Sequence, residues 1–190
     1  MAFWNQAVIE PKRNFRWYAS IPGLGEAGTD LKFLLKKFKK PTFEIKATEH
    51  MYLNHKFNFP GRLTWKESNF TLVNVANQTT NSGFKFDTVR LFMDKVVRAG
   101  YQNPSLQTGT TPVRTISKNG LVGSLGTIKV YQLGADGSGN AGNVQEVWQI
   151  YNPLITSIDM PDLDYSNEDL SELTVNFVYD YAVLEGAVTE

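Results

Sequence analysis

The chain has 190 residues, with 19 basic and 19 acidic side chains and therefore a formal net charge of zero. This length predicts one domain, and it is long enough to bury a hydrophobic core without disulfides. An apolar share of 42% excludes a disordered polyelectrolyte. The absence of cysteine excludes a disulfide framework, a thiolate zinc site and a cysteine nucleophile.

The net charge of zero conceals a gradient along the chain. Residues 1–66 contain 12 Lys and Arg against 5 Asp and Glu, a difference of +7, whereas residues 67–190 contain 7 against 14, a difference of −7. No basic residue follows Lys129. Opposite charges in the two halves indicate either a nucleic-acid-binding arm or a protein whose copies meet head to tail.

The beginning of the chain has no secretory signal, and no run of about 18 apolar residues would span a membrane. We therefore expect a protein made in a cytoplasm, with no membrane partner. Residues 1–10 are expected to form an N-terminal arm. Its aromatic residues Phe3 and Trp4 are candidate contacts with a neighbouring subunit, the alternative being that they pack on their own core.

Alternation of apolar and polar residues predicts strands along most of the chain. The longest alternating run places Leu173, Val175, Phe177, Tyr179 and Tyr181 on one face of one unbroken strand. We interpret Pro60, Gly61 and Arg62 as a turn between two strands and as a candidate inter-subunit contact, with ordinary hairpin geometry as the alternative. The other predicted strands are 15–21, 43–47, 51–59, 70–75, 127–133 and 144–150.

One segment changes period, because Val89, Phe92, Met93, Val96 and Val97 recur at helical spacing. This predicts a central helix over about 82–99, with Ser82 as its N-cap and Gly100 just beyond its end. Turn signals fill residues 103–126, and residues 134–143 are predicted to be a flexible Gly-rich loop. The expected fold is a single β-rich α+β domain spanning 1–190, a sandwich or barrel with one helix covering one end.

No arrangement of residues predicts an enzyme, a cofactor site or a metal site. His50 and His55 are five apart, which in one strand would place them on opposite faces. The acidic run from Asp159 to Glu172 lacks the glycine and glutamate of an EF-hand loop, and we expect Ser166 to cap a short helical turn there. Neither a nucleophile elbow nor a phosphate-binding loop occurs.

The segment 31–40 (LKFLLKKFKK) is the densest basic feature of the chain. It suits a membrane-surface helix, a nucleic-acid patch, or an extended segment whose lysines face solvent or an acidic neighbour. We favour the extended segment because Pro41 disfavours helix at Lys40 and because it also involves the acidic C-terminal third. Its candidate contact residues are Lys36, Lys37, Lys39 and Lys40.

Several collinear segments resemble the tail tube protein of contractile-tailed, T4-like bacteriophages. They are the opening PKRNFRW from Pro11, the run KPTFEIKATEHMYLNHKFNFPGRLTW over 40–65, KESNFTLVNVAN over 66–77, the helix ending in Ala99-Gly100-Tyr101, and LDYSNEDLSELTVNFVYDYA over 163–182. The resemblance implies a β-sandwich or barrel with one helix and a long protruding hairpin. It also implies a virion structural protein and not an enzyme.

Tail tube proteins form hexameric rings that stack into a tube inside a contractile sheath. The implied partners are therefore further copies of the chain, the sheath, the baseplate and tube-terminating proteins, and the tape-measure protein and DNA, which pass through the lumen without specific binding. The implied location is the virion tail, after assembly in the host cytoplasm. Asp162 and Asp164 are candidate partners of the lysine run in stacking, and the acids could instead line the channel.

Three alternatives stay open at this point. Two are related in fold: a tube initiator or terminator, and the tube protein of a secretion system. The third is of a different class, a nucleic-acid-binding module that would use residues 31–40 as its contact surface.

Overall fold

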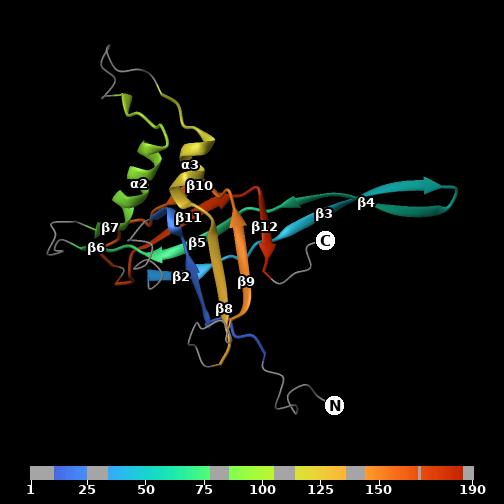
Figure 1. The fold of residues 1–190 in the computed structure, drawn as a ribbon, viewed down its shortest axis with the longest axis horizontal. Helices are drawn as coiled ribbons and strands as arrows, with labels where there is room; N and C mark the ends of the chain where they lie inside the picture. The colour runs from blue at the N-terminus through green and yellow to red at the C-terminus, as the bar shows by residue number, and fades with distance from the viewer. Residues whose placement is uncertain are drawn as a thin grey trace.

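The computed structural model describes residues 11–24, 34–77, 86–104, 114–135, 144–166 and 168–185. Two four-stranded antiparallel sheets pack face to face, helices lie at one end of them, and a long two-stranded hairpin projects from the body (Figure 1). Phe3 and Trp4, most of the 134–143 loop and Ser82 lie outside the described residues.

The first sheet has the strand order β1-β8-β9-β12 and the second has the order β10-β11-β5-β2. The first contains β1 (Trp17–Ser20), β8 (Ile128–Leu133), β9 (Val144–Tyr151) and β12 (Tyr181–Leu184). The second contains β2 (Leu35–Phe38), β5 (Ser68–Val73), β10 (Leu154–Asp159) and β11 (Glu172–Val178). The hairpin is formed by β3 (Phe43–Tyr52) and β4 (His55–Trp65).

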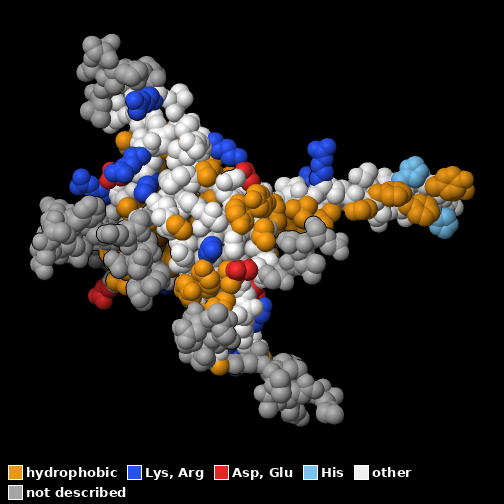
Figure 2. Space-filling model, viewed as in Figure 1, with side chains coloured by type: hydrophobic (Ala, Val, Ile, Leu, Met, Phe, Trp, Pro, Cys, Tyr) orange, Lys and Arg blue, Asp and Glu red, His pale blue; other side chains and the backbone are white. Residues whose placement is uncertain are grey.

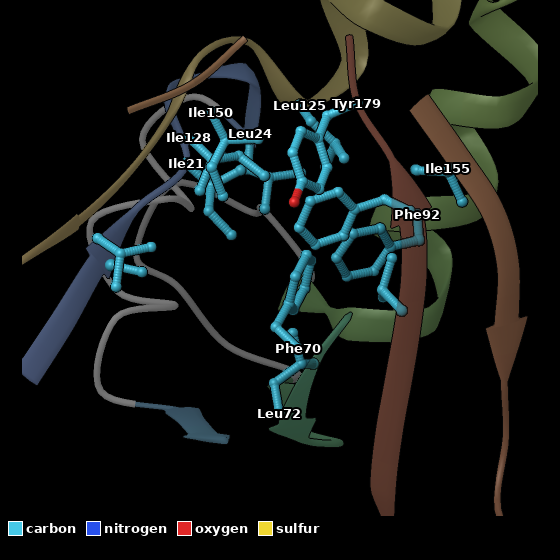
Figure 3. Packing of buried hydrophobic residues seen from close by; sticks show 14 of the residues in the cluster. Ile21, Leu24, Phe70, Leu72, Phe92, Leu125, Ile128, Ile150, Ile155 and Tyr179 are labelled. Atoms are coloured by element: carbon cyan, nitrogen blue, oxygen red, sulfur yellow. The ribbon is translucent and has the colours of Figure 1, made fainter. Parts of the chain in front are cut away.

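The core lies between the two sheets because each contributes one apolar face. In β8 and β11 buried residues alternate with partly exposed ones, the period-two pattern expected from the sequence. Phe70 is fully buried, with ring centroids 5.9 Å from Phe177 and 6.1 Å from Phe92. Figure 3 shows Phe70 and Phe92 in one buried cluster with aliphatic residues of the first sheet, such as Ile128 and Ile150.

The alternating run near the C-terminus is two strands and not one. Leu173, Val175, Phe177 and Tyr179 are buried as predicted, but the chain leaves the second sheet after Val178 and enters the first at Tyr181. A single continuous strand was therefore wrong. The buried phase also shifts at the crossing, because Tyr181, predicted on the same face, is 46% exposed and Ala182 is buried.

The helical prediction was right in type and wrong in extent. The helix α2 (Thr88–Arg98) begins at an N-cap made by Asp87, whose carboxylate accepts a hydrogen bond from the Arg90 amide at 3.0 Å. A short strand pair, β6 (Ala76–Asn77) with β7 (Phe86–Asp87), stands directly before it. The β7 pairing holds this backbone extended, so the helix cannot start at 82.

A second helix, α3 (Lys118–Leu125), lies where we expected only turns. Ser117 caps it by accepting from the Gly120 amide at 3.1 Å, and Gly126 ends it at φ 66°. Gly120 and Gly123 disguise this helix in the sequence because glycine is a poor helix former. A 3-10 turn, η2 (Pro22–Leu24), packs beside it. Within the described residues, no helix is long and apolar enough to cross a membrane.

Candidate assembly surfaces

The β3–β4 hairpin projects from the body with few neighbours of its own. Every residue of the two strands is exposed except Trp65, which is half-buried at the base. Figure 2 shows apolar side chains along its length and at its tip. The exposed large apolar side chains of this hairpin are Phe43, Ile45, Met51, Tyr52, Leu53, Phe57, Phe59 and Leu63. Because monomeric proteins rarely expose so much contiguous apolar surface, the hairpin is a candidate contact surface.

The hairpin turns at Leu53 and Asn54, immediately after Tyr52 and before its partner His55. Leu53 is at φ 53° and is 82% exposed, although a bulky residue rarely occupies this left-handed conformation. The turn also corrects the expectation for the histidines. His50 pairs with Phe57 and His55 with Tyr52, so both histidines lie on one face of the hairpin.

Pro60, Gly61 and Arg62 do not form a turn. They lie inside β4, where the register shifts between Ile45 and Ala47 on the opposite strand. Proline is tolerated there because each strand of a two-stranded hairpin has a free edge. Gly61 is required by a close approach, since a Cβ at this position would lie 2.3 Å from the Lys46 carbonyl oxygen. This bulge bends the hairpin and leaves Arg62 exposed along it.

The basic segment is extended from Leu35 onward, as predicted, and forms β2 at an edge of the second sheet. Lys36 forms an ion pair with Glu172 of the acidic C-terminal third. Its hydrogen bond to the carboxylate lowers the pKa of Glu172. Lys37 and Lys39 are exposed. The basic and acidic regions therefore meet within one chain at this edge. We expected the lysines to face either solvent or an acidic neighbour, and Lys36 has the acidic neighbour.

Lys40 belongs to a cluster around Glu146 that the sequence did not reveal. Its Nζ lies 2.8 Å from Glu146 Oε1, Lys12 binds the other oxygen, and Trp148 Nε1 donates to Oε1 at 2.5 Å. Burial alone would raise the pKa of Glu146. The hydrogen bonds from Lys12, Lys40 and Trp148 outweigh it and hold that pKa at about 2.

A cavity of about 220 Å³ lies beside this cluster, lined in part by Trp17, Phe38 and Trp148. Its polar lining consists of Lys40, Glu146, Gln132 and Asn14, and the first two already neutralise each other. Nothing in it pairs a nucleophile with a base. Nor do the described residues bring together three or more His, Asp or Glu side chains able to hold a metal ion.

Asp162 and Asp164 lie in an exposed connection between β10 and β11. The Asp164 carboxylate accepts hydrogen bonds from the Ser166 amide at 2.9 Å and the Ser166 hydroxyl at 2.8 Å, which lower its pKa. The helical turn that we expected Ser166 to cap is absent, because residues 168–171 in the described part of this connection are not helical. The chain forms a local turn there instead, because the Asp164 carboxylate accepts the hydrogen bond of the Ser166 amide two residues later.

Neither sheet is closed. The outer strands of the first sheet are β1 and β12, and those of the second are β10 and β2. Each presents backbone groups with no partner strand among the described residues. Unpaired edges usually favour association with another chain.

Comparison with known proteins places the chain by its fold. No protein-family model matches it, and no curated protein matches it. Among solved structures, a chain of the sheath/tube terminator of the PVC extracellular contractile injection system in its extended state has a TM-score of 0.61 at 13% identity, covering 95% of this chain and 100% of that one. A chain of the six-fold symmetrised anti-feeding prophage baseplate has a TM-score of 0.57 at 11% identity, covering 94% and 97%.

A chain of the PVC sheath-tube complex in its extended state is also similar, with a TM-score of 0.52 at 16% identity, covering 97% of this chain and 98% of that one. At these identities the similarity concerns the fold alone. The β-rich α+β tail-tube type of fold predicted from the sequence is therefore confirmed, with two helices described in place of one.

Proposed function

We propose that this protein is a structural subunit of the tube of a contractile injection machine, and that its copies assemble into rings. The observation that carries the proposal is the β3–β4 hairpin. Its eight exposed large apolar side chains are not buried against any other part of the described chain. An exposed apolar surface of this size marks a contact with another molecule. The fold shared with tube and terminator assemblies supports the choice of a further copy as that molecule.

The open sheets support ring closure. Each sheet alternates strand direction, so its outer strands run antiparallel to one another. When β10 of one copy meets β2 of the next around a ring, the new pair is therefore also antiparallel. This is a heterologous contact that closes, and it would extend the second sheet into a continuous barrel. We propose a ring of six copies, as the sequence resemblance implies.

Two places in the tube are open to such a subunit. The repeating ring is the first, in contact with the sheath outside and with the tape-measure protein and DNA inside, in a virion assembled in the host cytoplasm. The terminal ring is the second, and the structural comparison favours it, since the terminator assembly has the higher TM-score of 0.61 against 0.52 for the sheath-tube complex. Neither place requires a catalytic step or a cofactor.

A nucleic-acid-binding role for residues 31–40 receives less support. Lys36 and Lys40 are paired with Glu172 and Glu146 of the same chain, so these two cations are not free to neutralise phosphates.

Electron microscopy and sedimentation of the purified protein test the proposal. We expect rings, alone if the chain is terminal and stacked into tubes if it repeats. A Phe57→Ser, Phe59→Ser double variant should stay monomeric with an unchanged fold, because both side chains are at least half exposed. Phe15→Ser, which removes an exposed ring away from the hairpin, should assemble as the native chain does. A native protein that is monomeric at every concentration, or a hairpin variant that assembles normally, would refute the proposal.

A further inference from the structure

Outside the hairpin, the connection between β10 and β11 holds the most exposed large apolar side chains among the described residues. We define the acidic loop as residues 160–166 and 168–171. Leu163 is 94% exposed, Tyr165 is fully exposed and Leu170 is 73% exposed. The same residues include four acids and no base: Asp162, Asp164, Glu168 and Asp169. An isolated monomer gains nothing from exposing aromatic and leucine side chains in this way.

A second surface has the opposite charge. We define the basic end as Val97 and Arg98 at the end of α2, Tyr101, and Arg114 and Ile116 before α3. These parts are contiguous because the Ser117 amide bonds to the Ala99 carbonyl at 3.0 Å. Val97, Tyr101 and Ile116 are between 41% and 52% exposed. Neither arginine has an ion pair among the described residues. Figure 2 shows Lys and Arg side chains gathered over α2.

These two surfaces lie at opposite ends of the same pair of strands. The acidic loop follows Asp159 of β10 and precedes Glu172 of β11. At the other end, Lys118 of α3 bonds to Asp180 just beyond β11, at 2.9 Å. Asn152, just before β10, bonds to the same carboxylate at 2.8 Å. Strands of this length separate the two surfaces by about 20 Å.

We propose that the acidic loop of one copy docks on the basic end of a second copy, head to tail. The contact joins Leu163 and Tyr165 to the apolar part of the basic end, while Asp162 and Glu168 face Arg98 and Arg114. Because the two surfaces occupy opposite ends of one chain, the contact is open and repeats, which stacks one ring on the next. The inference rests on the proposed ring-forming function and adds to it the residues that join successive rings.

The proposed contact also distinguishes a terminal ring from a repeating ring. A terminal ring needs only one end able to join a ring of the same kind. A repeating ring needs both, and this chain has a complementary surface at each end, so the proposed contact favours the repeating ring, whereas the comparison of folds favours the terminal one. Charge complementarity sets the register of such a contact and excludes the reversed orientation, in which two acidic loops would face each other.

Charge reversal on each surface tests the contact. One variant carries Arg98→Glu and Arg114→Glu, and the other carries Asp162→Arg and Glu168→Arg. In each variant alone the substituted side chains face like charges, so we expect rings that need at least about tenfold more protein to stack. In an equal mixture, rings of the two variants can alternate along a stack. The substituted side chains then face opposite charges at every contact, and the mixture should stack like the native protein. A control with Arg13→Glu and Arg90→Glu carries the same charge change as the first variant, at other positions, and should stack normally.

The outcomes separate this contact from the function on which it rests. If native rings form but never stack, the stacking contact is refuted and a terminal ring is supported. If either variant stacks as the native chain does, or if the mixture fails to stack, the contact is refuted while ring formation stands. A native protein that forms no rings refutes both. A Leu163→Ser, Tyr165→Ser variant gives an independent measurement, since it should lose stacking without any change of charge.

Discussion

Replacing Glu146 by glutamine tests whether its cluster stabilises the fold. Lys12 holds the N-terminal segment and Lys40 the β2–β3 connection, and both bind this one carboxylate on β9. Glutamine keeps the shape of the side chain and an oxygen acceptor for Trp148, and it removes only the charge. The two lysines then lose their partner, so the variant reports on the ion cluster and not on packing.

The magnitude follows from the pKa. Glu146 has an ordinary pKa of 4.5 and a folded pKa of about 2. At about 1.36 kcal/mol for each pKa unit, this difference sets an upper bound of about 3.4 kcal/mol on its contribution at neutral pH. The carboxylate is 13% exposed, but the lysines are 50% and 43% exposed, so water and salt weaken the pairs. We expect Glu146→Gln to reduce the free energy of unfolding by about 1–2 kcal/mol at pH 7.

The pH dependence has a definite sign. Because the folded pKa is depressed, the contribution is complete above about pH 4.5 and is lost as the pH falls toward about 2. Urea unfolding of the native chain and the variant, at concentrations where sedimentation shows monomers, should give a difference at pH 3 less than half of that at pH 7. The control Glu49→Gln breaks an exposed hairpin pair with Lys56 and should change stability by less than about 0.5 kcal/mol at either pH. A Glu146→Gln effect equal at both pH values would refute the reasoning.

Three further predictions concern the core and the end of α3. Gly126→Ala should destabilise the fold by about 1–3 kcal/mol in thermal unfolding, because φ is 66° and a Cβ would lie 3.1 Å from the Gly23 amide nitrogen. Gly123→Ala should instead stabilise it by about 0.5–1 kcal/mol, since its Cβ meets no atom within 4 Å in the helix; a loss there would contradict the assignment of α3. Phe177→Ala should cost about 3–5 kcal/mol in urea unfolding, whereas Val178→Ala on the exposed face should cost less than about 1 kcal/mol, and equal losses would place the core elsewhere.

The strands of the two sheets could be predicted from the sequence because their alternation records which face meets the core. The runs 127–133 and 144–150 became β8 and β9, almost residue for residue. The same alternation was misleading in the hairpin. Phe57 and Phe59 follow the pattern of a half-buried strand, yet both are at least half exposed, since no other element of the described chain lies against them.

Some contacts of the candidate residues could be predicted from the sequence, and others depend on the fold. Charge alone indicated that the basic segment and the acidic C-terminal third belong together, and Lys36 does bind Glu172. It could not indicate that Lys40 would bind Glu146, because 106 residues separate them and only the pairing of β8 with β9 brings β9 to that edge of the core. Asp162 was a candidate contact from the sequence and stays one, paired then with the lysine run; the proposed partners Arg98 and Arg114 were not candidates, because only the fold shows that they lie at the opposite end of the same strands.

The sequence by itself determined the class of fold, the apolar face of most strands and the opposite charges of its two halves. These properties depend on residue type and on spacing of a few residues, which a strand or helix preserves. Only the tertiary structure decided which of these charges form ion pairs within one chain, and which remain exposed at its two ends. The physical reason is that partners far apart in the chain are chosen by the packing of the sheets, which no local pattern records.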